Sequence, residues 1–323
     1  MGNFHLQGKN LNLINKMGQK SHPYSLKSNF KNSTWSSKYI GKNSSSTSLL
    51  VVQDFNISNF LNTFFSMHGL ILCNYNLCRT QRNTYIYISY FSTKIASKLF
   101  KIKKKRKKKR RRKRNKKRKL FSFKRSGLVL KRKKFLNYKF LNKDIFINRN
   151  IFINKITSCL SLYLNHKYNI KVVLNNLNKG LSFRISNKES FLLRKSILKL
   201  RFYMRSDFFI ESINILLYSV RQKKAAKLLS EFIALRFSVL KKHNFFLTFI
   251  RRSLFNLVNS RYSIIKGIKI KIKGRFNGAP RSKTRMFKIN NLPSQTFKNA
   301  LDYYQSVSYN NNGTFGIKVW ISY

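Results

Sequence analysis

The chain contains few side chains that could carry out acid–base or metal chemistry. Only seven of its 323 residues are carboxylic acids: Asp54, Asp144, Glu189, Asp207, Glu211, Glu231 and Asp302. Asp207 and Glu211 are the one pair at the i, i+4 spacing that places both on the same face of a helix. Enzymes acting on nucleic acid generally need paired carboxylates for metal ions or a defined nucleophile, whereas a charge near a helix N-terminus explains this pair more simply.

The histidines and cysteines do not form a metal-binding pattern either. The five histidines show no HxxxH or HExxH spacing, and the three cysteines (Cys73, Cys78 and Cys159) include no CxxC pair. Isolated cysteines are commonly small buried hydrophobic residues. We therefore expect no metal, no cofactor and no small-molecule substrate.

Basic residues dominate the composition. The chain has 69 Lys and Arg against seven acids, a formal charge of +62, and a compact domain carrying that charge alone would repel itself. Nucleic acid is the best anionic partner, because its phosphates bind Lys and Arg with release of counterions. An anionic membrane surface is the alternative, but it calls for an amphipathic helix with a basic face. No run of 18 uncharged apolar residues occurs, so we expect no membrane insertion.

The positive charge is most concentrated between Lys101 and Lys119, where 17 of 19 residues are Lys or Arg. Like-charge repulsion prevents such a run from packing without counter-charge. It can be a solvated insertion, a nuclear-localisation signal, or an insertion that orders between phosphate backbones. We favour contact with RNA.

Apolar spacing predicts the elements that surround this run. In the first half it indicates helices at 54–67 and 151–165, and strands at 70–73, 84–91 and 170–174. In the second half it indicates a helix–turn–helix pair within 221–259. Alternating residues such as GIKIKIK then predict strands at 267–273, 284–289, 299–307 and 315–321. Two helices on one face of a four-stranded sheet make a two-layer α+β domain, whose other face would be basic.

Several motifs in the second half resemble one family. GIKIKIKGRFNGAPRSKTRMFKI starts at Gly267, and NLPSQTF, LDYYQSV and NGTFGIKVWI follow it. This series closely resembles the carboxy-terminal domain of the third protein of small ribosomal subunits, the S-three family. Near the amino end, MGQKSHP at 17–23 and NSTW at 32–35 resemble that family's opening motifs, which leaves open whether Met1 or Met17 is the start.

The resemblance implies a division of the chain. Residues 1–53 would be an extended basic arm, and 54–186 a type II KH-like domain interrupted by the basic insertion at about 97–150. Residues 187–220 would be a helical linker or insertion, and 221–323 the carboxy-terminal α+β domain. A KH domain clamps RNA with a GxxG loop, but the only GxxG here is Gly313–Gly316, in the other domain. Charge would replace that clamp.

The resemblance also implies a function and a set of RNA-binding residues. The family's members are structural constituents of the small subunit that bind rRNA, lie in its head near the mRNA entrance, and touch neighbouring ribosomal proteins and mRNA. Bacterial members carry basic residues on the helix before the final sheet. Arg251 and Arg252 match a basic pair there, whereas Leu247 and Thr248 replace arginines linked to strand separation. The expected RNA-binding residues are Gln19, Lys20, His22, Lys103, Lys104, Arg106, Arg110, Arg111, Arg112, Arg114, Arg118, Arg251, Arg252, Lys269, Lys271, Arg275, Arg281, Lys283 and Arg285.

The amino-acid composition and the start of the chain indicate the cellular compartment of the protein. The chain is rich in residues with A+T-rich codons, such as Lys, Asn and Ile, and has only six Ala. The first 16 residues contain no Arg and no apolar h-region, so we expect neither a secretory signal nor a mitochondrial presequence there. Both observations predict a protein encoded and used in a mitochondrion. The alternative to the ribosomal function is a nucleic-acid-processing enzyme, such as an intron maturase or endonuclease.

Overall fold

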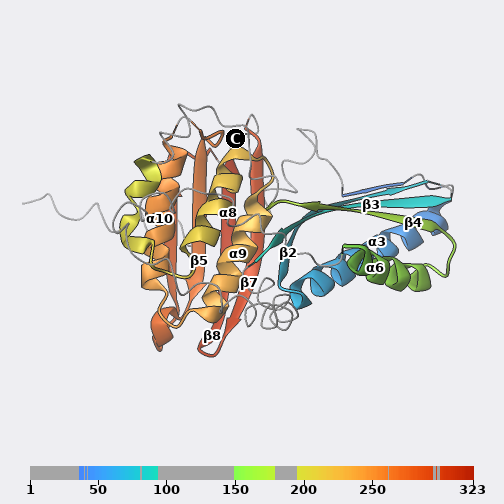
Figure 1. Cartoon of the computed structure of the whole chain (residues 1–323), viewed down its shortest axis with the longest axis horizontal. Helices are drawn as coiled ribbons and strands as arrows, with labels where there is room; N and C mark the ends of the chain where they lie inside the picture. The colour runs from blue at the N-terminus through green and yellow to red at the C-terminus, as the bar shows by residue number, and fades with distance from the viewer. Residues whose placement is uncertain are drawn as a thin grey trace, which may run out of the picture.

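Two four-stranded sheets, each carrying helices on one face, make up the described chain (Figure 1). The structure is a computed structural model that describes residues 36–39, 41, 43–80, 82–93, 149–178, 195–260, 262–293, 296 and 299–323. The first sheet and its helices come from the amino-terminal half of these residues. The second sheet and its helices come from the carboxy-terminal half.

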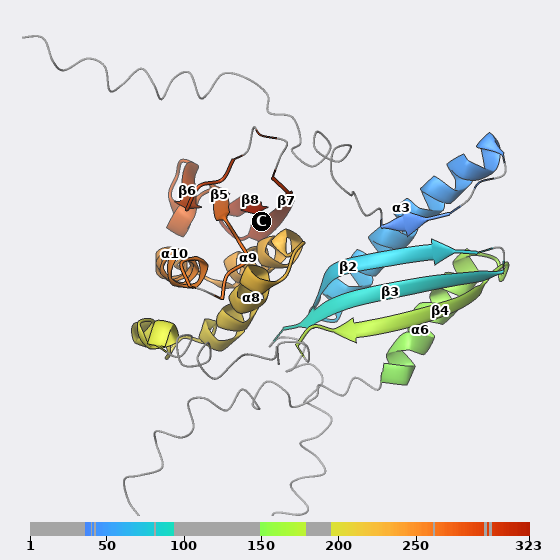
Figure 2. The ribbon, with the colours of Figure 1, turned by 90° about the horizontal axis from the view of Figure 1, so that it is seen from above.

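The first sheet has the strand order β1 (Ser37–Lys38), β2 (Leu70–Arg79), β3 (Asn83–Ser92) and β4 (Asn169–Asn176). The central pair β2–β3 is antiparallel, and the outer strands β1 and β4 run parallel to their neighbours. Helices α3 (Ser44–Met67) and α6 (Arg149–Tyr163) cover one face (Figure 2). The order helix, two strands, helix, strand is the one expected from the apolar spacing. The KH-like identification stays a prediction.

Helix α3 begins at Ser44, before the predicted start at Asp54. Asn43 and Ser46 form a capping box, in which the Asn43 N–H donates to Ser46 Oγ at 3.2 Å. Apolar spacing did not reveal these first turns because their apolar side chains are exposed. Asp54 lies inside the helix and forms an ion pair with Arg79 of β2, so it anchors the helix to its sheet.

The second sheet is antiparallel throughout and has the order β6-β5-β8-β7. Its strands are β5 (Gly267–Gly274), β6 (Lys283–Ile289), β7 (Leu301–Asn310) and β8 (Gly313–Ser322). Helices α9 (Ala226–Val239) and α10 (Asn244–Val258) lie on one face, and α8 (Phe209–Arg221) packs against these two helices (Figure 2). The α+β class and the four-stranded carboxy-terminal sheet are confirmed, and a third helix joins the expected pair.

The core of this second unit follows the predicted alternation. The three isoleucines that alternate with the lysines of β5 are buried against the helices, namely Ile268, Ile270 and Ile272. The whole predicted stripe of α10 is also buried, and it consists of Phe246, Phe249, Ile250, Leu254 and Leu257. The stripe predicted for α9 was wrong at its end, where Leu235 and Val239 are exposed. Ile233 and Phe237 are buried instead. An α-helix has 3.6 residues per turn, so the positions that face the sheet shift gradually along the helix.

Residues 195–221 belong to the same core. The short 3-10 helix η4 (Arg201–Tyr203) and α8 contribute buried side chains such as Leu200, Tyr203 and Ile215. Glu211, in the first turn of α8, is buried and forms an ion pair with Arg236 of α9. A carboxylate held in this way is part of the helix packing.

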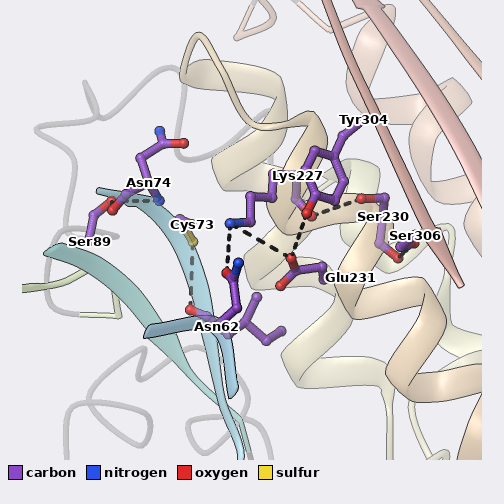
Figure 3. Close-up of polar contacts among 10 residues, drawn as sticks. Asn62, Cys73, Asn74, Ser89, Lys227, Ser230, Glu231, Tyr304 and Ser306 are labelled. Carbon is purple, nitrogen blue, oxygen red and sulfur yellow. Dashed lines mark hydrogen bonds and ion pairs between the residues drawn. The ribbon is translucent and has the colours of Figure 1, made fainter. Parts of the chain in front are cut away.

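A group of polar contacts joins α9 to the first unit (Figure 3). Lys227 Nζ donates to Asn62 Oδ1 of α3 at 3.2 Å and lies 4.0 Å from Glu231 Oε1. Tyr304 of β7 donates its hydroxyl to the same Glu231 oxygen at 3.3 Å. Burial raises the pKa of the Glu231 carboxyl, and Lys227 and Tyr304 oppose that rise. These contacts position the two units relative to each other.

Candidate nucleic-acid interface

The face of the second sheet that points away from the helices carries a row of lysines. Strand pairing fixes this, because residues directly opposite each other in antiparallel strands project from the same face. Lys269 pairs with Lys288 and Trp320, and Lys271 pairs with Met286 and Lys318. We call this surface the lysine face, and its charged members are Lys269, Lys271, Lys273, Lys288 and Lys318. None of the strand residues that the structure describes on this face is acidic.

Two pairs of lysines on this face oppose each other directly. Lys269 lies across from Lys288, and Lys271 lies across from Lys318. Like charges at such positions destabilise a sheet. Lys269 Nζ also lies 5.4 Å from the centroid of the Trp320 ring, which is a cation–π distance. A sheet surface that repels itself in this way is suited to an anionic ligand.

Trp320 lies on the lysine face, so it does not belong to the core beneath the helices. Its ring is partly exposed and lies 5.2 Å from the ring of Tyr303, which occupies the opposing position on β7. The strand alternation explains this position, because Val319 and Ile321 take the buried positions.

One end of the sheet carries further basic residues on the turn between β5 and β6. Arg275, Arg281 and Lys283 are all exposed there, and Arg275 Nε donates to the Ala279 carbonyl at 2.8 Å. Gly278 has φ +78, a conformation that favours glycine. The turn therefore presents Arg275 and Arg281 beside Lys273 of the lysine face, whereas Lys283 begins β6 opposite Gly274, on the same side of the strand as Arg285.

A buried histidine holds this turn against the helices. The backbone N–H of Asn277 donates to His243 Nδ1 at 3.2 Å, and the backbone N–H of His243 donates to Asn277 Oδ1 at 2.8 Å. The imidazole stacks on Phe237 and contacts Phe315. Burial lowers the pKa of His243 and favours the neutral ring, although its hydrogen bonds oppose the shift. The histidine thus fixes the backbone from which Arg275 and Arg281 project.

Arg285 differs from the other predicted residues of this region. It lies opposite Ile272, on the helix side of the edge strand β6, and its guanidinium is 4.9 Å from the centroid of the Phe276 ring. Arg285 was predicted among the phosphate-facing residues, whereas Lys273, Lys288 and Lys318 were not among the predicted RNA-binding residues. Alternation about the buried Ile289 and Val319 was the signal that could have found two of these lysines.

The predicted basic pair on the helix lies on α10, away from the lysine face. Arg251 and Arg252 are both exposed. Leu247 is buried in the core and Thr248 is exposed, so the helix presents one cationic pair. The remaining predicted residues lie outside the described part of the chain, namely Gln19, Lys20, His22, Lys103, Lys104, Arg106, Arg110, Arg111, Arg112, Arg114 and Arg118.

The carboxylates that the structure describes form hydrogen bonds and ion pairs within the fold. Asp302 Oδ2 accepts the backbone N–H of Ala226 at 2.8 Å and so caps the start of α9. Within the described ranges, no group of three His, Cys, Asp or Glu side chains could hold a metal ion. No helix of those ranges has the length and apolar character needed to span a membrane. Of the free cysteines, Cys73 is buried and Cys159 is exposed.

Comparison with known proteins connects this architecture to one family. The family model "Ribosomal protein S3, C-terminal domain" matches residues 248–321, which include most of α10 and the whole second sheet. Small ribosomal subunit protein uS3 of Karelsulcia muelleri is 45% identical over 56 residues, or 17% of this chain and 25% of that protein. Small ribosomal subunit protein uS3c of Chlamydomonas moewusii is 35% identical over 115 residues, 35% of this chain.

These two matches are partial, since the chain spans a quarter of the Karelsulcia protein and 14% of the Chlamydomonas protein. A third relative extends much further. Small ribosomal subunit protein uS3c of Euglena longa is 30% identical over 195 residues, which cover 59% of this chain and 82% of the relative. The chain therefore belongs to the uS3 family of small ribosomal subunit proteins.

Proposed function

We propose that this protein is a structural constituent of the small subunit of the mitochondrial ribosome, where it binds rRNA. The observation that carries the proposal is the lysine face. Its two directly opposed lysine pairs cost stability in the free protein, and a phosphate backbone across them would convert that cost into binding energy. The overall charge of +62 extends the same argument to the whole chain.

The mode of binding is neutralisation of phosphate. The lysine face and the arginines of the adjoining turn, Arg275 and Arg281, offer charged donors that pair with phosphate oxygens of any sequence. The part of the predicted arm that precedes α3, and the basic insertion at 97–150, would add phosphate contacts of the same kind. This arrangement suits close packing of rRNA helices more than recognition of a sequence.

The finer parts of the proposal come from the family resemblance and the composition. The protein would lie in the head of the subunit near the mRNA entrance, beside other ribosomal proteins, and Arg251 and Arg252 of α10 would contact mRNA. The A+T-rich coding bias supports an organelle-encoded protein, and we assign it to the mitochondrion. In a KH-like first unit without a GxxG loop, the polybasic insertion would make the RNA contact by charge.

The enzyme alternative finds no support at the carboxylates. Asp54 and Glu211 form ion pairs with arginines, and Asp302 caps a helix. The prediction that the chain is not an enzyme is confirmed by its membership of a family of ribosomal proteins.

Sedimentation tests the proposal directly. Extracts of fractionated mitochondria are separated on a sucrose gradient, and the protein is followed with an antibody. It should travel with the small subunit and shift to light fractions after ribonuclease digestion. Recovery in light fractions before digestion, or with membranes after it, would contradict the proposed function.

A further inference from the structure

Strand β7 forms one edge of the second sheet and lacks the lysines, prolines and bulges that block most edge strands. The order β6-β5-β8-β7 leaves one side of β7 without a partner among the strands that the structure describes (Figure 2). The strand is ten residues long, pairs with β8 without a register shift, and contains no Pro, Lys or Arg. The opposite edge, β6, is shorter, at seven residues, and carries Lys283, Arg285 and Lys288. Of these two edges, β7 is therefore the one open to pairing with a further strand.

Hydrogen bonds to α9 hold β7 extended. Ser306 Oγ donates to the Ser230 carbonyl at 2.9 Å, and Ser308 Oγ donates to the Ala234 carbonyl at 2.7 Å. The two serines are alternate residues of the strand, so both lie on its helix side. A strand that is already ordered loses little conformational entropy when it binds. The edge is thus preorganised for a partner.

The remaining side chains of β7 lie on the open side of the sheet, beside the lysines, and carry no charge. Val307 is 47% exposed and Tyr309 is 74% exposed. Val307 lies opposite Gly316 of β8, and no heavy atom of the described chain lies within 4 Å of the position that a Cβ would take there. A glycine within a strand often marks a place where another backbone approaches closely. The open side therefore has a basic part on β5, β6 and β8 and an uncharged, partly apolar part on β7.

This division of charge decides which partner fits β7. RNA phosphates find cations on the lysine face, but β7 itself offers none. A second copy of the chain is disfavoured by its charge of +62, and the chain's own residues 1–35 contain five lysines and no acid. A strand of another protein fits, because its main chain can pair with the edge while its alternate side chains pack on Val307 and Tyr309. Lys318 lies opposite Gln305, so a segment without net positive charge is preferred.

We propose that the edge of β7 binds an extended segment of another small-subunit protein, which carries no net positive charge and adds a fifth strand to the sheet over residues 305–310. The inference rests on the proposed function, since the partner is a component of the subunit, and it gives β7 a different kind of partner from the lysine face. RNA would cover the lysines, and the added strand would cover Val307 and Tyr309. The sheet would join RNA to protein along one surface.

Photo-crosslinking in assembled small subunits tests this proposal. The full chain carries either Val307→p-benzoylphenylalanine or Tyr309→p-benzoylphenylalanine, at side chains whose exposure lets the fold accept the change. Small subunits containing it are irradiated, digested with ribonuclease and trypsin, and analysed by mass spectrometry. Both positions should cross-link to one peptide of another subunit protein. The two attachment sites should lie about two residues apart, because alternate residues of paired strands share a face.

Met286→p-benzoylphenylalanine is the matched control, since Met286 is 56% exposed on the lysine face and lies opposite Lys271. It should cross-link to rRNA. Cross-links from position 309 to RNA, to this chain itself or to nothing would overturn the inference, as would protein attachment sites without the spacing of a paired strand. In each of these cases an rRNA cross-link from position 286 would leave the proposed function standing, whereas absence of the protein from small subunits would refute that function itself.

Discussion

Removing one opposed lysine pair should make the free protein more stable and its RNA complex weaker. Lys271 and Lys318 face each other on adjacent antiparallel strands, and a like-charge pair at such positions costs roughly 0.2–1 kcal/mol. The double substitution Lys271→Gln, Lys318→Gln should therefore raise the free energy of unfolding by about 0.5 kcal/mol at low salt. High salt should abolish the gain, because the repulsion is screened.

RNA binding should change in the opposite direction. Each phosphate contact contributes about 0.7–0.9 to the slope of log K against log salt concentration. Loss of two contacts should make this slope shallower by about 1.4–1.8 for any RNA sequence. Urea unfolding gives the stability, and anisotropy titrations with a fragment of small-subunit rRNA at several salt concentrations give the slope.

The matched control is Lys155→Gln with Lys167→Gln. Both lysines are exposed on the first unit, so the net charge changes by the same amount without an opposed pair being removed. The control should leave the unfolding free energy and the salt slope near the wild-type values. The reasoning would be refuted if both double variants changed the slope equally, because net charge alone would then account for binding.

Substitutions at three further residues test the contacts that hold the second unit together. Glu211→Gln should lower the free energy of unfolding by up to about 3–5 kcal/mol in urea, because it neutralises the buried carboxylate that pairs with the half-buried Arg236, which keeps its interaction with Asp207; a loss below about 1 kcal/mol would show that the ion pair is unimportant. Asp302→Ala should cost about 1 kcal/mol by removing the cap of α9, while Asp302→Asn, which can still accept that bond, should cost less. The pKa of His243 is lower in the folded state, so the unfolded state binds its proton first and stability should fall as pH drops below about 6.5. His243→Phe should flatten this part of the stability–pH curve between pH 7 and pH 5, and an unchanged curve would contradict a buried neutral imidazole.

Sequence periodicity predicted the elements well where one face is buried. The alternation in GIKIKIK and the stripe of α10 gave the correct buried faces, because water is excluded from one side of each element. Helix α3 was predicted too short for the converse reason. Its first turns bury no apolar side chain, so only the capping residues Asn43 and Ser46 mark its start.

The candidate site was predicted less completely than the fold. Lys269 and Lys271 were found because they alternate with buried isoleucines within one strand. Alternation could also have shown that Lys288 and Lys318 face outward, but their opposition to Lys269 and Lys271 depends on the register between strands, which a single strand's sequence does not contain.

Lysine footprinting in intact small subunits tests the central claim most directly. Purified mitochondrial small subunits are treated with an amine-acetylating reagent, and modification of each lysine is measured by mass spectrometry before and after ribonuclease digestion. Lys271, Lys288 and Lys318 should be protected in the intact subunit and become reactive after digestion. If these three lysines react fully in the intact subunit, then the lysine face does not bind rRNA and the account is wrong.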